Sequence, residues 1–191
     1  MENLMKYINR HRQRIELIIE LIFLTALFIL GIFLDYIAAA SLFWQFYLFM
    51  AVLALLLLLP VYLVSRRKQE LWLFLGFNIS LLALQFVTIN PRKPFVKFYL
   101  DIKNDMTIED VQSLFNQRFP KGGRFPQPEW TIRDETTADA ENHQLNGRTF
   151  IAKPNQNLQY ILDPNDGRYN AEWVIVYLKD GKVVGTNYSP D

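Results

Sequence analysis

Residues 42–64 read LFWQFYLFMAVLALLLLLPVYLV, an apolar stretch with the five leucines Leu55–Leu59 at its centre. The stretch carries no charged residue, and its length matches the roughly 20 residues that cross a 30 Å hydrocarbon core as a helix. Two further apolar stretches flank it, at Leu17–Ala40 and Leu71–Ile89. The sequence therefore predicts an all-α membrane domain over residues 1–90, with three transmembrane helices at about 15–38, 42–64 and 71–89.

The basic residues of the short connections predict an orientation. Residues 1–14 and 65–70 are rich in Lys and Arg, whereas the connection at residues 35–41 has neither. Because Lys and Arg favour cytoplasmic loops, the N-terminus is expected in the cytoplasm and residues 91–191 on the other side of a bacterial cytoplasmic or other inner membrane. An alternative treats Ala38–Ala40 as a signal-peptide cleavage site, although Glu16 and Glu20 are unusual in such a segment.

Three charged residues lie on one face of the first predicted helix. Arg12, Glu16 and Glu20 are spaced one helical turn apart. One interpretation is an ion or proton site, and the other is a helix end whose carboxylates pair with Arg12 or reach the lipid headgroups. The second interpretation is favoured.

Polar and small residues also interrupt the third apolar stretch. Asn78 and Gln85 share a helix face, and Gly76 and Ser80 have the small-xxx-small spacing that lets helices approach closely. We expect these four residues to make helix–helix contacts. A substrate path along them is the alternative, which would make the protein a small transport or channel subunit.

The second half of the chain, residues 91–191, predicts a small α+β domain with an antiparallel sheet. Phe95–Ile102 is rich in aromatic and β-branched residues and predicts a strand. Thr107 is a helix N-cap with Asp110 three residues later, and the helix is expected to end near Phe119. Further strands are predicted at Glu129–Arg133 and Arg148–Ala152, and Asp180-Gly181 is the preferred type I′ turn of a closing hairpin, residues 173–187.

Catalytic and metal-binding patterns are weak in this domain. The Gly122-Gly123 turn lacks the Lys-Ser/Thr and helix of a phosphate-binding loop, and residues 163–174 lack the glycine and glutamate positions of a calcium-binding loop. A serine triad around His143 has no suitably placed serine. We predict no catalytic residue, cofactor or metal. The partner-binding candidates are the exposed-turn and aromatic residues Lys121, Arg124, Phe125, Trp130, Trp173 and Tyr177.

The absence of cysteine and the near-neutral charge exclude further classes of function. The chain has no cysteine, which excludes disulfides, thiolate catalysis and Cys-ligated metals, and its formal net charge is +1. No basic stripe stands out, so nucleic-acid binding is not expected. The expected partners are membrane lipid and a membrane or envelope protein, and the oligomeric state stays open.

Two segments resemble a known family. Asp105–Leu114 (DMTIEDVQSL) is similar to the helix-opening Gly-Met-Thr-x-x-x-Val-x-x-x-Leu signature of SmpA/OmlA (BamE-like) domains, and Trp173–Val184 (WVIVYLKDGKVV) is similar to their final hairpin. The resemblance implies an α+β domain outside the cytoplasmic membrane that binds other proteins as an assembly factor, without catalytic residues. Asn104-Asp105 replaces the glycine before Met106, residues 116–120 replace the usual helix end, and the family's lipid-bearing cysteine is absent.

These observations lead to one expected function and two alternatives. A membrane-anchored interaction module, whose outside domain binds an envelope or membrane-complex protein, is the leading interpretation. A transport or channel subunit would depend on Glu20, Asn78 and Gln85. An enzyme would have only the loosely clustered residues His143, Asp163, Asp166 and Glu172.

Overall fold

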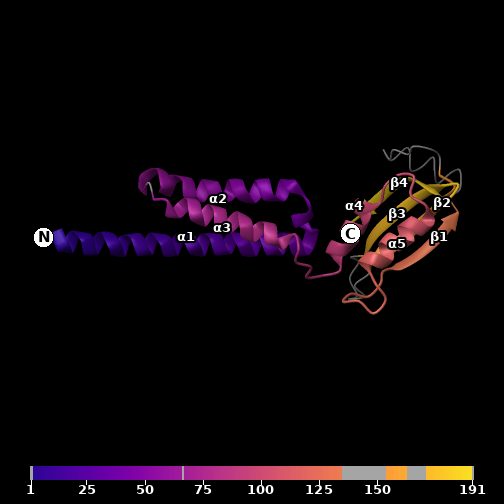
Figure 1. Ribbon diagram of the computed structural model, residues 1–191, viewed down its shortest axis with the longest axis horizontal. Coiled ribbons are helices and arrows are strands. Elements are labelled where there is room, and N and C mark those ends of the chain that lie inside the picture. Colours follow the sequence, from indigo (N-terminus) through magenta and orange to yellow (C-terminus); the bar gives the residue numbers. More distant parts are fainter. Residues whose placement is uncertain (1, 66, 135–153, 163–170, 191) are drawn as a thin grey trace. The chain divides into compact units, whose positions relative to one another are not determined.

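The computed structural model describes residues 2–65, 67–134, 154–162 and 171–190. The chain divides into two compact units, residues 1–89 and residues 90–191, which we call the helical unit and the α+β unit. Figure 1 labels their elements. The predicted strand at 148–152, His143 and the turn at 163–167 lie outside the described residues.

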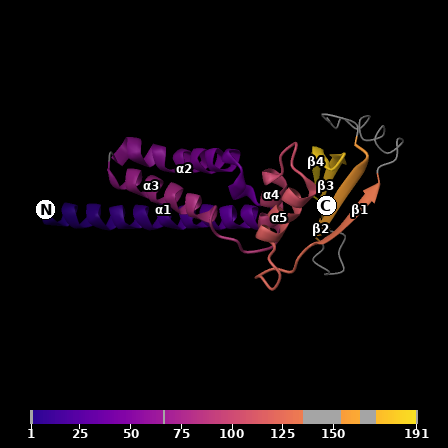
Figure 2. The ribbon, with the colours of Figure 1, turned by 45° about the vertical axis from the view of Figure 1, so that its right-hand side comes forward.

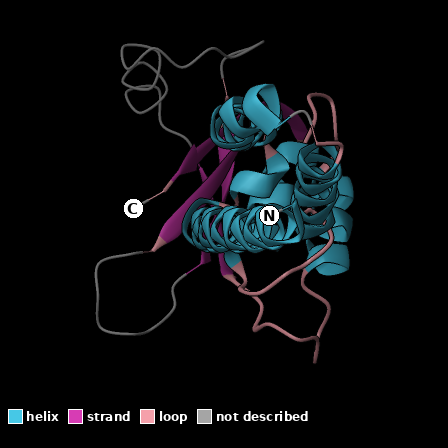
Figure 3. Ribbon diagram, turned by 90° about the vertical axis from the view of Figure 1, so that its left-hand side faces the viewer, coloured by secondary structure: helices cyan, strands magenta, loops and turns pink. Residues whose placement is uncertain are grey.

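The helical unit consists of helices packed side by side. It contains α1 (Glu2–Ala38), the short 3-10 helix η1 (Ala40–Leu42), α2 (Trp44–Ser65) and α3 (Gln69–Leu84). Figure 3 shows these helices nearly end-on. Their shared core includes Met50, Ala54 and Leu81, each 0% exposed. The three main helices therefore enclose a narrow apolar core.

Two helices are long and apolar enough to cross a membrane. The spans are His11–Ala38, of 28 residues, and Trp44–Val64, of 21 residues, and only 17% of the most apolar window of each is buried. Apolar helices in the core of a soluble protein are mostly buried, so this low burial separates the two spans from that class.

The predicted third span is wrong in length. The helix α3 has 16 residues and ends at Leu84, not at residue 89. At a rise of 1.5 Å per residue it is about 24 Å long, which is shorter than a hydrocarbon core of about 30 Å. The backbone tightens before Pro91, because the N–H groups of Phe86 and Val87 donate to carbonyls three residues back, at 3.1 Å each. Two helices, not three, therefore reach spanning length within the described residues.

The α+β unit has two helices and a sheet. The helices are α4 (Arg92–Asp101) and α5 (Ile108–Arg118), and the strands are β1 (Glu129–Asp134), β2 (Gln156–Leu162), β3 (Glu172–Lys179) and β4 (Lys182–Ser189). The strands pair antiparallel in the order β1-β2-β3-β4. Both helices lie on one face of the sheet (Figure 2). The predicted mixture of helices and an antiparallel sheet is therefore present.

The predicted strand at 95–102 is wrong, because this segment is the helix α4. Proline is tolerated in a first helical turn, where its missing N–H has no intrahelical acceptor, so Pro94 does not prevent the helix. Phe95, Phe98 and Ile102 recur at i, i+3 and i+7, and all three are buried in the core of the unit. This helical periodicity outweighs the β-propensity of the individual residues.

The other predicted elements of this unit are confirmed where they are described. Thr107 caps α5 with the expected box: its hydroxyl accepts from Asp110 N at 3.2 Å, and its N–H donates to Asp110 Oδ2 at 3.0 Å. The turn between β3 and β4 has positive φ at both Asp180 (51°) and Gly181 (76°), which is the type I′ requirement. The strand β1 is also confirmed, whereas β2 was not predicted from the sequence.

Candidate functional site

A cleft in the helical unit lies between the first half of α1 and the end of α2. Its volume is 660 Å³, within the range of small-molecule sites. One side is apolar and formed by α2 residues, and the other side carries charged residues of α1. The lining residues are Arg12, Gln13, Glu16, Ile19, Glu20, Pro60, Val61, Val64 and Arg67.

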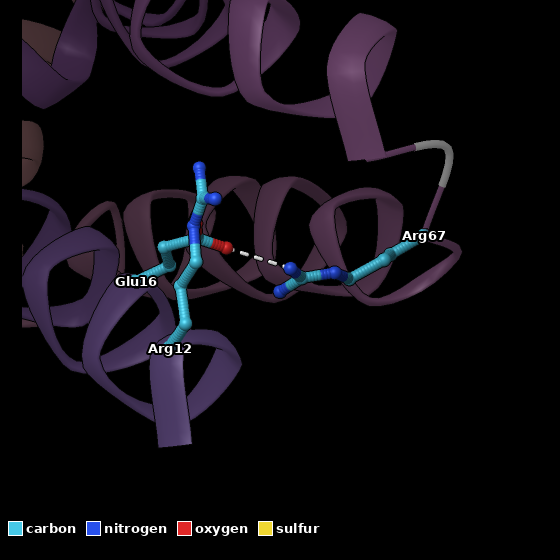
Figure 4. Close-up of polar contacts among 3 residues, drawn as sticks. All are labelled: Arg12, Glu16 and Arg67. Carbon is cyan, nitrogen blue, oxygen red and sulfur yellow. Dashed lines mark hydrogen bonds and ion pairs between the residues drawn. The ribbon is translucent and has the colours of Figure 1, made fainter. Parts of the chain in front are cut away.

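Glu16 lies between two arginines at the mouth of this cleft. Its Oε1 accepts from Arg12 Nε at 2.9 Å, and its Oε2 accepts from Arg67 Nη2 at 2.6 Å. Figure 4 shows the Glu16 side chain between the two guanidinium groups, with the dashed line marking the pair with Arg67. The favoured pairing of Glu16 with Arg12 is therefore confirmed, and Arg67 adds a link between α1 and the connection after α2 that sequence spacing alone did not indicate.

Glu20 differs from Glu16, although the two lie one turn apart. Glu20 is 5% exposed, and its Oε1 has no hydrogen-bond partner among the described residues. Glu70, Arg67 and Glu16 lie within electrostatic reach of it. A buried carboxyl group without a full set of partners binds a proton or a cation more readily than a solvated one. Among the described residues that line the cleft, Glu20 is therefore the one with a buried side-chain oxygen that lacks a hydrogen-bond partner.

The four predicted helix-contact residues do not form the close helix contacts of this unit. Asn78 Nδ2 donates to Phe74 O at 2.8 Å and Ser80 Oγ donates to Gly76 O at 2.9 Å, so both side chains bond within α3. Gly76 has no atom within 4 Å of an added Cβ, and Gln85 is exposed. Gly76 and Ser80 line a cleft together with the α1 residues Leu24, Thr25 and Phe28, so α1 faces them without a close approach at Gly76.

The close approach occurs instead at Gly31 on α1. A Cβ placed there would lie 3.2 Å from Leu81 Cδ2 and 3.2 Å from Met50 Cε. Sequence reasoning missed this glycine, because small-xxx-small spacing was sought only in the third apolar stretch. A lone glycine inside a long apolar helix was the available signal.

The predicted partner-binding residues of the α+β unit fall in separate places. Lys121 and Arg124 are exposed in the turn after α5, where the Arg124 guanidinium lies 5.2 Å from the centroid of the Phe125 ring. Phe125 itself is partly buried against the core.

The remaining three aromatic candidates lie on the sheet. Trp130 is 44% exposed on β1, and its ring centroid is 6.4 Å from that of Tyr160. Trp173 is partly buried on the face of the sheet that α4 and α5 leave free, and Tyr177 is 0% exposed. The structure does not bring the six candidates together into one patch.

Glu172 is the only described member of the loosely clustered residues considered for catalysis. It is 1% exposed at the start of β3, pairs with Arg92, and accepts a hydrogen bond from the Tyr188 hydroxyl at 2.7 Å. These contacts join the start of α4 to β3 and β4 and give Glu172 a structural role. Among the described residues no group of three or more His, Cys, Asp or Glu is placed to hold a metal ion.

Comparison with protein-family models, with curated protein sequences and with solved structures finds no match to this chain. The fold and the candidate site therefore rest on the geometry described above.

Proposed function

We propose that this chain is a membrane-anchored, non-catalytic interaction or assembly module whose α+β unit binds an envelope or membrane-complex protein. The observation that carries the proposal is the contrast in surface between the units. The helical unit exposes large apolar side chains such as Leu56 (64%) and Trp72 (71%), which suits lipid. The α+β unit has a closed apolar core, while Trp130 and Trp173 on its sheet are exposed and partly exposed.

The proposed topology has the N-terminus in the cytoplasm and the α+β unit on the non-cytoplasmic side. This arrangement needs an odd number of crossings, so α3 would cross together with residues 85–89 that follow it. A short apolar helix can span by local thinning of the bilayer or by extension of its flanking residues. The lysine- and arginine-rich connection at residues 65–70 supports this orientation.

The proposed binding surface is the helix-free face of the sheet. Ile161, Trp173 and Ile175 lie on this face and are partly exposed. Partly exposed aromatic and aliphatic side chains are the usual anchors of protein interfaces. The resemblance to BamE-like domains, which act as assembly factors, supports the same proposal.

The proposal is tested by crosslinking the full-length protein in its native membrane and purifying it in mild detergent. We expect a defined partner that is lost from a chain truncated after Asn90 and reduced by Trp173→Ala. Lys179→Ala, an exposed change on the same strand, is the matched control, and an unfolding midpoint verifies that each variant is folded. A partner retained by the truncated chain would move the function into the helices and overturn the proposal.

A second candidate function is a small transport or channel subunit, and Glu20 is the observation that favours it. A buried carboxyl group lining a cleft in apolar helices is typical of proton and cation pathways. The test is proton or monovalent-cation flux in proteoliposomes. Glu20→Gln should abolish the flux and Gln13→Ala, at the rim of the same cleft, should not. Flux that is absent from the unmodified protein would reject this function.

A further inference from the structure

The strand β1 forms one edge of the sheet. Each of its six residues, Glu129–Asp134, is exposed, and within the described part of the chain β2 is its only strand neighbour. An edge strand carries backbone N–H and C=O groups that point away from the sheet and can pair with another strand. The β1 edge therefore offers a template for one more strand.

The opposite edge of the sheet does not offer the same template. The chain itself covers the start of β4, because Asp105 N donates to Val183 O and Val183 N donates to Met106 O, both at 2.9 Å. Thr107 forms an isolated bridge with Lys182. The segment Asp105–Thr107, which leads into α5, thus occupies part of this edge, and β1 is the edge with exposed residues along its whole length.

The two faces of β1 carry different chemistry. Trp130 and Ile132 pair in register with Tyr160 and Leu158, which belong to the core beneath the helices. The helices do not cover Trp130 and Ile132, which remain 44% and 48% exposed. The alternate residues Glu129, Thr131 and Arg133 lie on the helix-free face. Within the described residues, neither Glu129 nor Arg133 has an ion-pair partner.

Two copies of β1 can pair antiparallel about a two-fold axis only in a few registers. Directly opposed residues must lie on the same face of the sheet, so the axis passes through a residue that faces its own copy. Centring on Ile132 sets Trp130 against Asp134 and Thr131 against Arg133. Centring on Trp130 sets Glu129 against Thr131. Neither of these registers is complementary.

Centring on Thr131 gives complementary pairs throughout. Glu129 then opposes Arg133 of the second copy, and Trp130 opposes Ile132 of the second copy. Both pairs occur twice by symmetry, and Thr131 faces Thr131 at the axis. Opposite charges, an aromatic with a β-branched residue, and paired threonines are the cross-strand combinations that stabilise antiparallel sheets.

We propose that the occupant of the β1 edge is a second copy of this chain, paired through β1 in the Thr131-centred register. The result is one continuous sheet of eight strands with the helices of both copies on the same face. The interface is short, and confinement of both copies to one membrane raises their effective concentration. This inference goes beyond the proposed function, because it assigns a self-association surface whatever other protein the helix-free face binds.

The first test uses the absence of cysteine from the chain. Thr131→Cys in the full-length protein, oxidised in its native membrane, should give a disulfide-linked dimer, because directly opposed residues have the Cα separation that a disulfide needs. Ser189→Cys, at an exposed residue of β4, is the matched control and should remain monomeric. Equal crosslinking of both variants, or none at Thr131→Cys, would overturn the proposal.

The second test separates this register from any other contact near Thr131. In the Thr131→Cys background, Glu129→Arg alone and Arg133→Glu alone each place like charges opposite each other in both pairs. Each should reduce crosslinking about fivefold, the change expected for two cross-strand pairs. Co-expression of the two single variants restores both pairs in the mixed dimer, as does the double variant in its own dimer. Loss of crosslinking that neither combination restores would exclude this register.

Discussion

In the helical unit large apolar side chains lie mostly on the outside, whereas in the α+β unit they lie mostly inside. Leu56 is 64% exposed and Phe86 85% exposed, while Phe98 and Val176 are 0% exposed. This contrast fits a helical unit in lipid and an α+β unit in water. In water, burial of apolar side chains stabilises a sheet and the helices packed on it. In lipid, an exposed apolar side chain carries no penalty, so helices associate there through close packing instead.

Two buried carboxyl groups, one in each unit, differ in their hydrogen-bond partners. Glu172 of the α+β unit has both oxygens engaged, one by Arg92 and one by Tyr188. Glu20 of the helical unit has one oxygen without a hydrogen-bond partner among the described residues. A water-soluble core keeps a charge only when it is compensated, so the contrast separates a structural carboxyl group from one that is available for binding.

The largest expected effect comes from the core of the α+β unit. Phe98 lies 4.8 Å from the Tyr160 ring centroid and 5.5 Å from that of Phe115. Phe98→Ala should reduce the free energy of unfolding by about 3–5 kcal/mol, because it removes buried area and leaves a cavity. Urea unfolding of the full chain in detergent, followed by segment-resolved hydrogen exchange, measures this. Phe33→Ala, at a 57% exposed residue of α1, is the control, and an equal loss there would break the comparison between the units.

A smaller effect on stability is expected from the substitution of a glycine in the helical unit. Gly31→Leu introduces a side chain where a Cβ already meets Leu81 and Met50 at 3.2 Å. Overpacking of this kind costs about 1–3 kcal/mol. Gly76→Leu should leave the packing of this unit unchanged, because no atom lies within 4 Å of its added Cβ. Protection of the α1–α3 segments against hydrogen exchange in detergent distinguishes the two variants.

The reverse order would contradict the packing role of Gly31. If Gly76→Leu disrupted the protein in the membrane and not in detergent, a partner helix from outside the chain would be indicated at α3.

Sequence patterns predicted the structure best where interactions between residues close in sequence determine it. The cap at Thr107, the Asp180-Gly181 turn and the apolar runs of α1 and α2 each depend on residues a few positions apart. The β2 strand was missed because its polar residues Gln156, Asn157 and Gln159 hide the inward alternation of Leu158, Tyr160 and Leu162. That alternation indicates a strand only when β3 pairs beside it.

Long-range arrangement accounts for the other differences. Phe95 and Phe98 have the composition of a strand, and the core beneath the sheet selects the helical spacing that buries both. The pairing of Glu16 with Arg67 joins residues 51 positions apart and follows from how α1 and α2 pack. Spacing along one helix predicted the partner Arg12 and the candidates on α3, but it could not identify Gly31 as the close approach.

Two tyrosines, the buried Tyr160 and the partly buried Tyr188, extend the comparison of polar groups with and without hydrogen-bond partners. Tyr188 donates to the Glu172 carboxylate, whereas the Tyr160 hydroxyl has no hydrogen-bond partner among the described residues. Tyr188→Phe should cost about 1–3 kcal/mol, because a buried carboxylate loses a donor, and Tyr160→Phe should be close to neutral. Thermal unfolding at pH 7 measures both, and an equal cost would show that Tyr160 has a partner after all.

The choice of pH 7 follows from the ionisation of these hydroxyls. Burial raises the pKa of Tyr188, although the charge of Arg92 opposes the effect, and burial also raises the pKa of Tyr160. A raised folded-state pKa contributes stability that is fully present below the unfolded value near 10 and is lost as pH rises through the folded value. Both hydroxyls are therefore protonated at pH 7, and the phenylalanine variants should be less sensitive to alkaline unfolding than the unmodified chain.

The smallest effect concerns helix starts, which differ between α3 and α5. The N-cap residue of α3, Lys68, makes no side-chain cap, whereas α5 begins with the box of Thr107 and Asp110. Thr107→Ala should reduce the free energy of unfolding by about 1 kcal/mol, because an N–H at the start of α5 loses its acceptor. Gln69→Ala, in the first turn of the uncapped helix α3, is the control and should change little.

Low pH should remove the contribution of the Asp110 carboxylate to the stability of the folded chain. Hydrogen bonds from the Thr107 N–H and hydroxyl hold the pKa of Asp110 below its usual value. A lowered folded-state pKa gives stability that is present above the unfolded value near 4 and lost as pH falls through the folded value. The unfolding midpoints of Asp110→Asn and the unmodified chain should therefore differ at pH 7 and converge in acid below that range. A gap that stays constant across the titration would mean that the amide replaces the carboxylate as acceptor, and the charge of Asp110 would then have no part in starting α5.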